Sequence, residues 1–189
     1  NLLFMLIITL FVQSCAPLVG TVGMVSLGAA SKEKGLGTSI NDSLIKTKIS
    51  NLIYKYNKDL IADTKVFVNN GSVLYTGKLN NPNDKIEFTK LAWNIRGVKE
   101  VNNEIQITDT SSLKNIARDI ASVGEIRARI MADKSINSIN FSIDVVNDTA
   151  YISGVATSEL EMNLVKSHAS SARFIKEVYN YIILNKDTR

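Results

Sequence analysis

The chain has 189 residues, with 22 basic and 18 acidic side chains and a formal net charge of +4. The basic residues are spread along the chain, which argues against the cationic groove of a nucleic-acid-binding protein. One cysteine and one histidine exclude an internal disulfide and a zinc cage. We therefore expect no nucleic-acid partner, no metal and no cofactor.

The amino-terminal segment carries a secretion signal. Residues 2–12 read LLFMLIITLFV, an apolar run that is too short to cross a bilayer, which needs ~20 residues. Val12-Gln13-Ser14-Cys15 follows and resembles a bacterial lipobox, in which a small residue precedes the cysteine that takes a diacylglycerol. We expect residues 1–14 to be a signal peptide and Cys15 to be the lipidated residue.

A second interpretation of this segment stays open. Small and apolar residues continue to Ala30, and no charged residue appears before Lys32, so the stretch also suits an uncleaved transmembrane anchor. Pro17 and several glycines weaken a continuous helix. Both interpretations place the folded part outside the inner membrane. Residues 15–40 are expected to be a tether.

The rest of the chain is an internal repeat. When the sequence is aligned with itself so that Ser43 lies over Ile120, the match runs without a gap to Ile107 over Leu184, and twelve of the aligned pairs are identical. Repeats of this length mark one structural unit that occurs twice. We expect one domain over residues 41–109, a short linker, and a second domain over residues 116–185.

Each copy predicts the same order of elements. In the first copy, a helix with apolar residues at 45, 49, 52, 53 and 56 starts near Asp42 or Ser43, which can cap it. Strands over 65–69 and 72–78 follow, joined by Asn70-Gly71, a strong hairpin signal. A second helix over 83–95 and a last strand over 98–108 complete the unit.

The second copy repeats this order, with helices near 116–132 and 159–172 and a last strand over 175–184. Its first helix is expected to bury a stripe made of Ile116, Ile120, Val123, Ile126 and Ile130. The fold class is therefore α+β, with two tandem αββαβ units. Each unit is a three-stranded mixed sheet with two helices on one face.

This order of elements resembles the BON domain family. The resemblance is carried by Gly77 and by the run Gly97-Val98-Lys99-Glu100-Val101-Asn102-Asn103-Glu104-Ile105. The second copy departs from it at Phe174, which replaces the glycine of the run, and at Asp148, which replaces the turn glycine. With the lipobox, the chain resembles the dual-BON lipoproteins of proteobacterial envelopes.

The resemblance implies a binding role at the membrane. It implies attachment to anionic phospholipid, support of outer-membrane integrity, and a place on the periplasmic face of the outer membrane. It also implies that the first helix of the second unit faces the lipid, where four cations are the candidate contacts: Arg118, Arg127, Arg129 and Lys134. This helix has no aromatic residue to insert into a membrane, and a charged face that lies simply in water is the alternative.

The sequence shows no set of side chains that would form a catalytic site. His168 aligns with Leu91 of the first copy, so it is interpreted as structural rather than catalytic. We expect a non-enzymatic protein. The alternative function is an adaptor whose two units hold an envelope protein partner without touching lipid.

The last strand of the second copy has an unusual outer face. Where the first copy has Asn102, Glu104 and Gln106, the second has Tyr179, Tyr181 and Ile183. Alternate residues of a strand share a face, so these three side chains lie on the face that no helix of their unit covers. We expect this face to be an interface, either with the first domain or with a partner. A tail folded back over it is the alternative.

Overall fold

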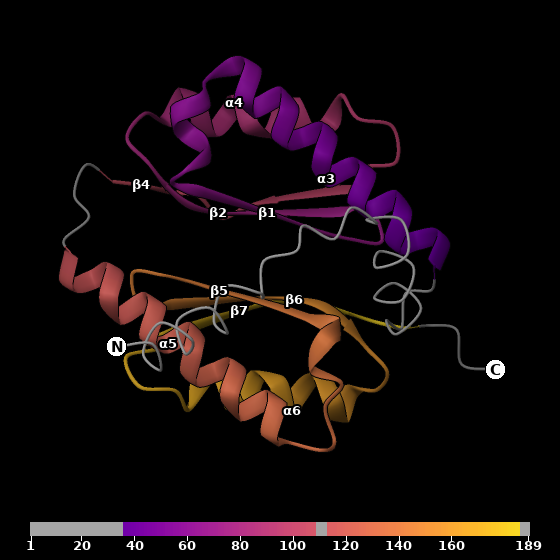
Figure 1. The fold of residues 1–189 in the computed structure, drawn as a ribbon, viewed down its shortest axis with the longest axis vertical. Helices are drawn as coiled ribbons and strands as arrows, with labels where there is room; N and C mark the ends of the chain where they lie inside the picture. Colours follow the sequence, from indigo (N-terminus) through magenta and orange to yellow (C-terminus); the bar gives the residue numbers. More distant parts are fainter. Residues whose placement is uncertain (1–35, 109–112, 186–189) are drawn as a thin grey trace, which may run out of the picture.

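The computed structural model describes residues 36–108 and 113–185, and these form two αββαβ units, as expected from the repeat (Figure 1). The first unit contains α3 (Leu36–Tyr56), the 3₁₀ turn η1 (Lys58–Ile61), β1 (Thr64–Asn69), β2 (Ser72–Leu79), α4 (Pro82–Trp93), β3 (Glu100–Asn103) and β4 (Gln106–Ile107). The expected signal peptide and Cys15 lie outside the described residues. Residues 36–40, expected to belong to the tether, are helical.

The second unit contains α5 (Leu113–Ala132), the 3₁₀ turn η2 (Ser138–Asn140), β5 (Phe141–Val146), β6 (Thr149–Ala156), α6 (Glu159–Ser170) and β7 (Glu177–Leu184). In each unit the middle strand pairs with the first strand in an antiparallel and with the last in a parallel arrangement. The expected mixed sheet is therefore confirmed. The last strand of the first unit is divided into β3 and β4, and both pair with β2.

The two sheets face each other and the helices lie outside them (Figure 1). Helices α3 and α4 cover the first sheet through a core that contains Ile49, Tyr75 and Phe88. Helices α5 and α6 cover the second sheet through a core that contains Ile126, Ile152 and Val165. Among residues 36–108 and 113–185, every buried hydrophobic residue lies between Ile45 and Ile182, so residues 36–189 contain all of the described core contacts. A fragment of that length is therefore expected to fold without the amino-terminal segment.

The first helix of each unit contains an aspartate with an unexpected role. The expectation that Asp42 or Ser43 caps α3 is wrong, because the helix begins earlier, at Leu36. The two carboxylate oxygens of Asp42 instead accept hydrogen bonds from the backbone N–H groups of Asn70 and Gly71, at 2.9 and 3.0 Å. Asp119, the counterpart of Asp42 in the second copy, does the same for the hairpin that joins β5 and β6. Each carboxylate thus fastens the helix to the hairpin turn of its own unit.

The glycine that aligns between the copies permits a close backbone approach. A Cβ atom on Gly77 would lie 2.1 Å from the carbonyl oxygen of Asp63, and one on Gly154 would lie 2.3 Å from that of Asn140. No other residue fits where the first and second strands meet at this distance. The match of Gly77 to the family motif therefore has a steric cause.

The expected apolar stripe of α5 is partly wrong. Ile126 and Ile130 are buried, but Ile120 is 67% exposed and Ile116 is 39% exposed. The buried side of α5 instead continues through Ser122 and Asp119. Two large apolar side chains of this helix consequently face solvent or the space beside the first unit.

Candidate functional site

The contact between the two sheets is a small apolar cluster with polar links around it. Its buried members are Leu74 from the first unit and Val146 and Tyr151 from the second, with Phe67 and Tyr181 packed against them. Leu74 aligns with Tyr151 in the repeat, so these two residues occupy the same position in the two copies. The two units therefore meet through equivalent surfaces, as in a twofold dimer.

The strand residues expected to form an interface lie on this side of the second sheet. The hydroxyl of Tyr181 donates a hydrogen bond to a carboxylate oxygen of Glu104 in the first unit. Burial and this carboxylate together raise the pKa of the Tyr181 hydroxyl far above its ordinary value. Tyr179 stacks on Tyr151 with 5.5 Å between ring centroids and keeps 43% of its surface exposed. Ile183 is half-buried on the same face.

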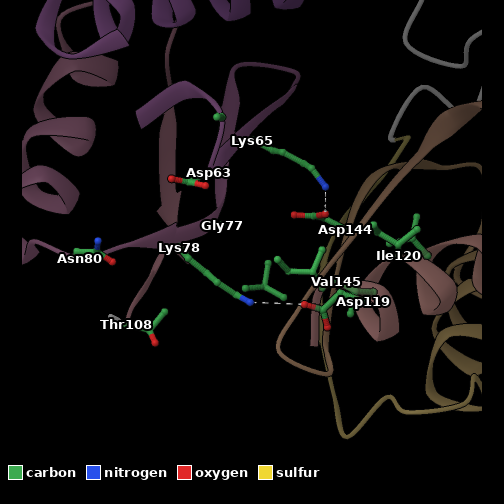
Figure 2. A pocket seen from close by; sticks show the side chains of 14 residues that line it. Asp63, Lys65, Gly77, Lys78, Asn80, Thr108, Asp119, Ile120, Asp144 and Val145 are labelled. Carbon is green, nitrogen blue, oxygen red and sulfur yellow. Dashed lines mark hydrogen bonds and ion pairs between the residues drawn. The ribbon is translucent and has the colours of Figure 1, made fainter. Parts of the chain in front are cut away.

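Beside this cluster lies a cleft of about 520 Å³ between the units. Figure 2 shows Lys65 and Lys78 of the first unit pointing toward Asp144 and Asp119 of the second. Lys65 forms an ion pair with Asp144, and Lys78 lies 3.7 Å from Asp119. Ile116, Ile120 and Val123 of α5 line the apolar part of the cleft.

Two of the three aspartates that line the cleft, Asp144 and Asp119, make structural contacts. Asp144 is almost fully buried and also accepts a hydrogen bond from the Thr76 hydroxyl. Asp119 accepts the two hairpin amides described above. Both cations and both acids therefore hold the units together, and these two acids are not free for proton transfer.

The remaining chemistry-bearing residues also have structural roles. His168 Nε2 lies 2.8 Å from an oxygen of Asp133, which joins α6 to the end of α5. The described residues contain no group of three or more histidine, cysteine or acidic side chains that suits a metal ion. Among the same residues, no helix has the length and hydropathy needed to cross a membrane.

The outward side of α5 is unusual for a helix in water, because it is apolar along its length. Six of its exposed residues are small or hydrophobic, and we call them the α5 crest: Ala117, Ile120, Ala121, Gly124, Ala128 and Met131. Ile120 lies at the edge of the crest, because it also lines the cleft. The exposed Lys114 and Arg127 lie on the same helix outside the crest. Met131 is 73% exposed and Ile120 is 67% exposed. The crest contains no charged residue, although helices on a protein surface normally place charged and polar residues there.

The first copy shows that the fold does not require such a crest. At the positions of α3 that align with Ile120, Gly124 and Ala128, the chain has Ser43, Thr47 and Asn51. These three residues are exposed on α3. The outer face of α3 is therefore interrupted by polar residues, although Leu44 and Tyr54, which align with Ala121 and Met131, are exposed there too. Sequence reasoning missed the crest because Ile116 and Ile120 were assigned to the buried stripe, and the alignment of Ile120 with Ser43 was the available signal.

The four cations expected to contact lipid lie near the crest, and two of them are ion-paired whereas two are not. The Arg118 side chain, 29% exposed, forms an ion pair with Asp148, and Arg129 forms one with Glu125. Arg127 and Lys134 are exposed and make no ion pair within the part of the chain that the structure describes. The structure thus places all four at or just beyond α5, but only Arg127 and Lys134 present an uncompensated charge.

Comparisons with known proteins agree with the architecture. The BON domain model matches residues 41–109 and again residues 112–186. The chain is 34% identical over 146 residues to a protein of Anaplasma centrale named "Uncharacterized protein in gshII 5'region", covering 77% of this chain and 95% of the relative.

Two further relatives have descriptive names. The chain is 26% identical over 172 residues to the "Outer membrane lipoprotein DolP" of Haemophilus influenzae, covering 90% of this chain and 88% of the relative. It is 24% identical over 147 residues to the "Osmotically-inducible protein Y" of Escherichia coli, covering 77% and 73% of the two chains.

Proposed function

The chain belongs to the BON domain family, and we propose that it is a non-enzymatic envelope protein that rests on anionic phospholipid through α5. In this proposal a lipid on Cys15 anchors it to the periplasmic face of the outer membrane, where it supports the integrity of that membrane. The single observation that carries the proposal is the exposed apolar crest of α5 beside exposed cations.

The energetics of the crest favour a membrane as its partner. Transfer of the exposed parts of Ile120 and Met131 out of water is worth about 3 kcal/mol in total, because full burial of one such side chain is worth roughly 1.5–3 kcal/mol. Arg127 and Lys134 add ~1 kcal/mol each close to an anionic surface. An apolar helix face with flanking cations is the pattern of helices that lie in the headgroup layer.

The lipid anchor rests on the amino-terminal motif and on one relative. Val12-Gln13-Ser14-Cys15 resembles a lipobox, and the Haemophilus relative is named an outer membrane lipoprotein. A diacylglycerol inserts two acyl chains, which is enough for stable anchoring, so in this proposal the contact through α5 determines how the folded part lies on the bilayer. Mass spectrometry of the native protein should find a lipidated peptide that starts at Cys15; an intact peptide from Leu10 to Ala16 contradicts the anchor.

Vesicle binding by residues 36–189 tests the α5 contact without the anchor. We expect co-sedimentation with vesicles that contain phosphatidylglycerol, weaker binding as salt is raised, and little binding to phosphatidylcholine. No binding to anionic vesicles at low salt contradicts the proposal and favours the alternative, an adaptor that holds an envelope protein.

Variants locate the contact on the second unit. Replacing the α5 crest residues by their first-copy counterparts (Ile120→Ser, Gly124→Thr and Ala128→Asn) should weaken vesicle binding. A Cβ atom at Gly124 meets nothing within 4 Å, so the change is compatible with the fold. The matched control replaces Ser43, Thr47 and Asn51 of α3 by alanine and should bind as the wild type does. A crest variant with unchanged binding contradicts the role of α5.

Charge reversal tests the electrostatic part separately. Arg127→Glu with Arg129→Glu removes the unpaired cation Arg127 and adds two carboxylates to α5. Binding to anionic vesicles should fall by more than about fivefold, since one free cation is worth ~1 kcal/mol and the added carboxylates repel anionic lipid. The aligned residues of the first copy are Ser50 and Leu52, so the basic pair is specific to the second unit. Unchanged co-sedimentation by a folded double variant defeats this part of the proposal.

A further inference from the structure

The turn between α6 and β7 contains an exposed aromatic residue in a backbone conformation that glycine normally occupies. Phe174 has a φ of 72°, in the left-handed region, and is 40% exposed. The aligned residue of the first copy is Gly97, whose φ is 102°. A bulky residue with positive φ is rare, because its Cβ atom crowds the neighbouring carbonyl oxygen.

Helix α5 holds this turn in place. The Ser122 hydroxyl donates a hydrogen bond to the carbonyl oxygen of Arg173 at 2.9 Å, and the Arg173 N–H donates one to Glu125 at 3.0 Å. The aligned residues of α3 are Ile45 and Lys48, which can make neither contact. In the second copy, two side chains of α5 therefore hold the backbone of Arg173, the residue that precedes Phe174.

The same helix also makes room for the phenylalanine. In the first unit, a Cβ atom on Gly97 would lie 3.2 Å from the Cδ1 atom of Ile45. Position 45 is the counterpart of Ser122, whose side chain is much shorter. The aromatic side chain and its compensating serine thus occur together in the second copy.

Two arginines lie against the ring. The Arg118 guanidinium lies 4.8 Å from the ring centroid and that of Arg173 lies 5.8 Å from it. Lys176 follows in the same turn, and Asp148 forms ion pairs with both Arg118 and Lys176. Asp148 thus pairs with two cations, and the exposed Arg173 adds a third beside Phe174. Glu125, the other nearby acid, is paired with Arg129.

We propose that Phe174 is the aromatic anchor of the second unit, and that it enters the headgroup region of an anionic bilayer beside α5 while the exposed Arg173 contacts lipid phosphates. This rests on the function proposed above, and it supplies the aromatic residue that α5 itself lacks. An aromatic ring is suited to the boundary between hydrocarbon and headgroups, and guanidinium groups bind phosphate with paired hydrogen bonds.

A tryptophan placed at the turn reports directly on insertion. The chain has one tryptophan, Trp93, which is exposed on the first unit. In residues 36–189, Trp93→Phe with Phe174→Trp moves the only indole to the turn. On phosphatidylglycerol vesicles with brominated lipid, its emission should shift to the blue and be quenched. The native Trp93 of the unmodified fragment, bound to the same vesicles, should show neither change.

Two substitutions measure the contribution to affinity. Phe174→Gly introduces the first-copy residue and removes the steric cost of the positive φ, so the fold is expected to persist. Vesicle affinity should fall about tenfold, because the aromatic ring is lost. Trp93→Ser, which also introduces the residue of the other copy, removes an exposed aromatic side chain from the first unit and should leave affinity unchanged.

The outcomes separate this inference from the proposed function. If the fragment binds vesicles while the indole at position 174 is unquenched and Phe174→Gly binds normally, Phe174 is not an anchor and the α5 contact stands alone. If the unmodified fragment does not bind anionic vesicles, both are overturned.

Discussion

Tyr181 donates its hydroxyl hydrogen bond to Glu104, and these two residues occupy the same position of the two copies. One duplicated position has thus diverged into a donor and an acceptor that face each other across the contact between the sheets. A symmetric pair of glutamates would repel at this point, and the tyrosine replaces that repulsion with a hydrogen bond.

The Tyr181–Glu104 contact should couple the two units energetically. Tyr181→Phe and Glu104→Gln are each expected to lower the free energy of unfolding, and a double-mutant cycle should give a coupling of about 1 kcal/mol, typical of a partly exposed hydrogen bond to a charged group. Urea unfolding measures the cycle. Strictly additive effects would mean that the bond contributes nothing to the domain contact.

The two aspartates that bond the hairpin from the first helix, Asp42 and Asp119, should contribute similarly to the free energy of unfolding. Asp42→Asn and Asp119→Asn each leave one hairpin N–H with an uncharged acceptor and the other with none, and we expect a loss of about 2 kcal/mol for either change. Thermal unfolding of both variants provides the comparison. A change below about 0.5 kcal/mol in either one would contradict the structural role given to that carboxylate.

Because residue 174 has a left-handed conformation, we expect glycine to give a more stable protein than alanine at this position. Alanine keeps the steric cost of a positive φ and loses the ring, whereas glycine has no such cost. Phe174→Gly should therefore be more stable than Phe174→Ala by about 1 kcal/mol. Calorimetry of the two variants decides this, and equal stability would show that the turn relaxes without cost.

The contact between Asp133 and His168 should make stability depend on acidity. The His168 hydrogen bond, assisted by the Ser135 N–H, holds the pKa of Asp133 below its ordinary value of 3.8. Because the folded-state pKa is depressed, this stabilisation is present above that ordinary value and is lost as the pH falls through the lowered one.

Asp133→Asn should accordingly be less stable than the wild type at pH 7, and the difference should shrink toward zero near pH 2. In a His168→Leu background, which introduces the residue of the first copy, Asp133→Asn should have a smaller effect at pH 7. Denaturant unfolding at both pH values measures this. A difference that is the same at both would rule out the depressed pKa as its cause.

The duplication made much of the fold predictable from sequence. Aligning Ser43 with Ile120 revealed the αββαβ order of both units, and the Asn70-Gly71 signal located the first hairpin. The boundaries of α3 could not be predicted, because Asp42 carries a typical capping side chain that the fold uses for the hairpin instead. Extending the alignment by one residue, to pair Asp42 with Asp119, was the missing signal.

The candidate site was less predictable than the fold. Hydrophobic periodicity cannot separate a buried isoleucine from one exposed for another partner, so Ile120 was placed in the core stripe although it is exposed. The charges of Arg118 and Arg129 were visible in the sequence, but their carboxylate partners depend on tertiary packing. Phe174 was visible only as a departure from the glycine of the motif. Its two arginine neighbours come from different elements.

The central claim is that the α5 crest meets the bilayer, and a scan of spin labels tests it most directly. Residues 36–189 contain no cysteine, so single cysteines can be labelled one at a time at Ala117, Ile120, Gly124, Ala128 and Met131. On phosphatidylglycerol vesicles, collisions with dissolved oxygen should rise at all five positions, which share one side of an α-helix with about 3.6 residues per turn. Labels at Ser43, Thr47 and Asn51 of α3 should remain as they are in solution. Vesicle-bound protein whose α5 labels show no rise, or whose α3 labels rise instead, would contradict the account.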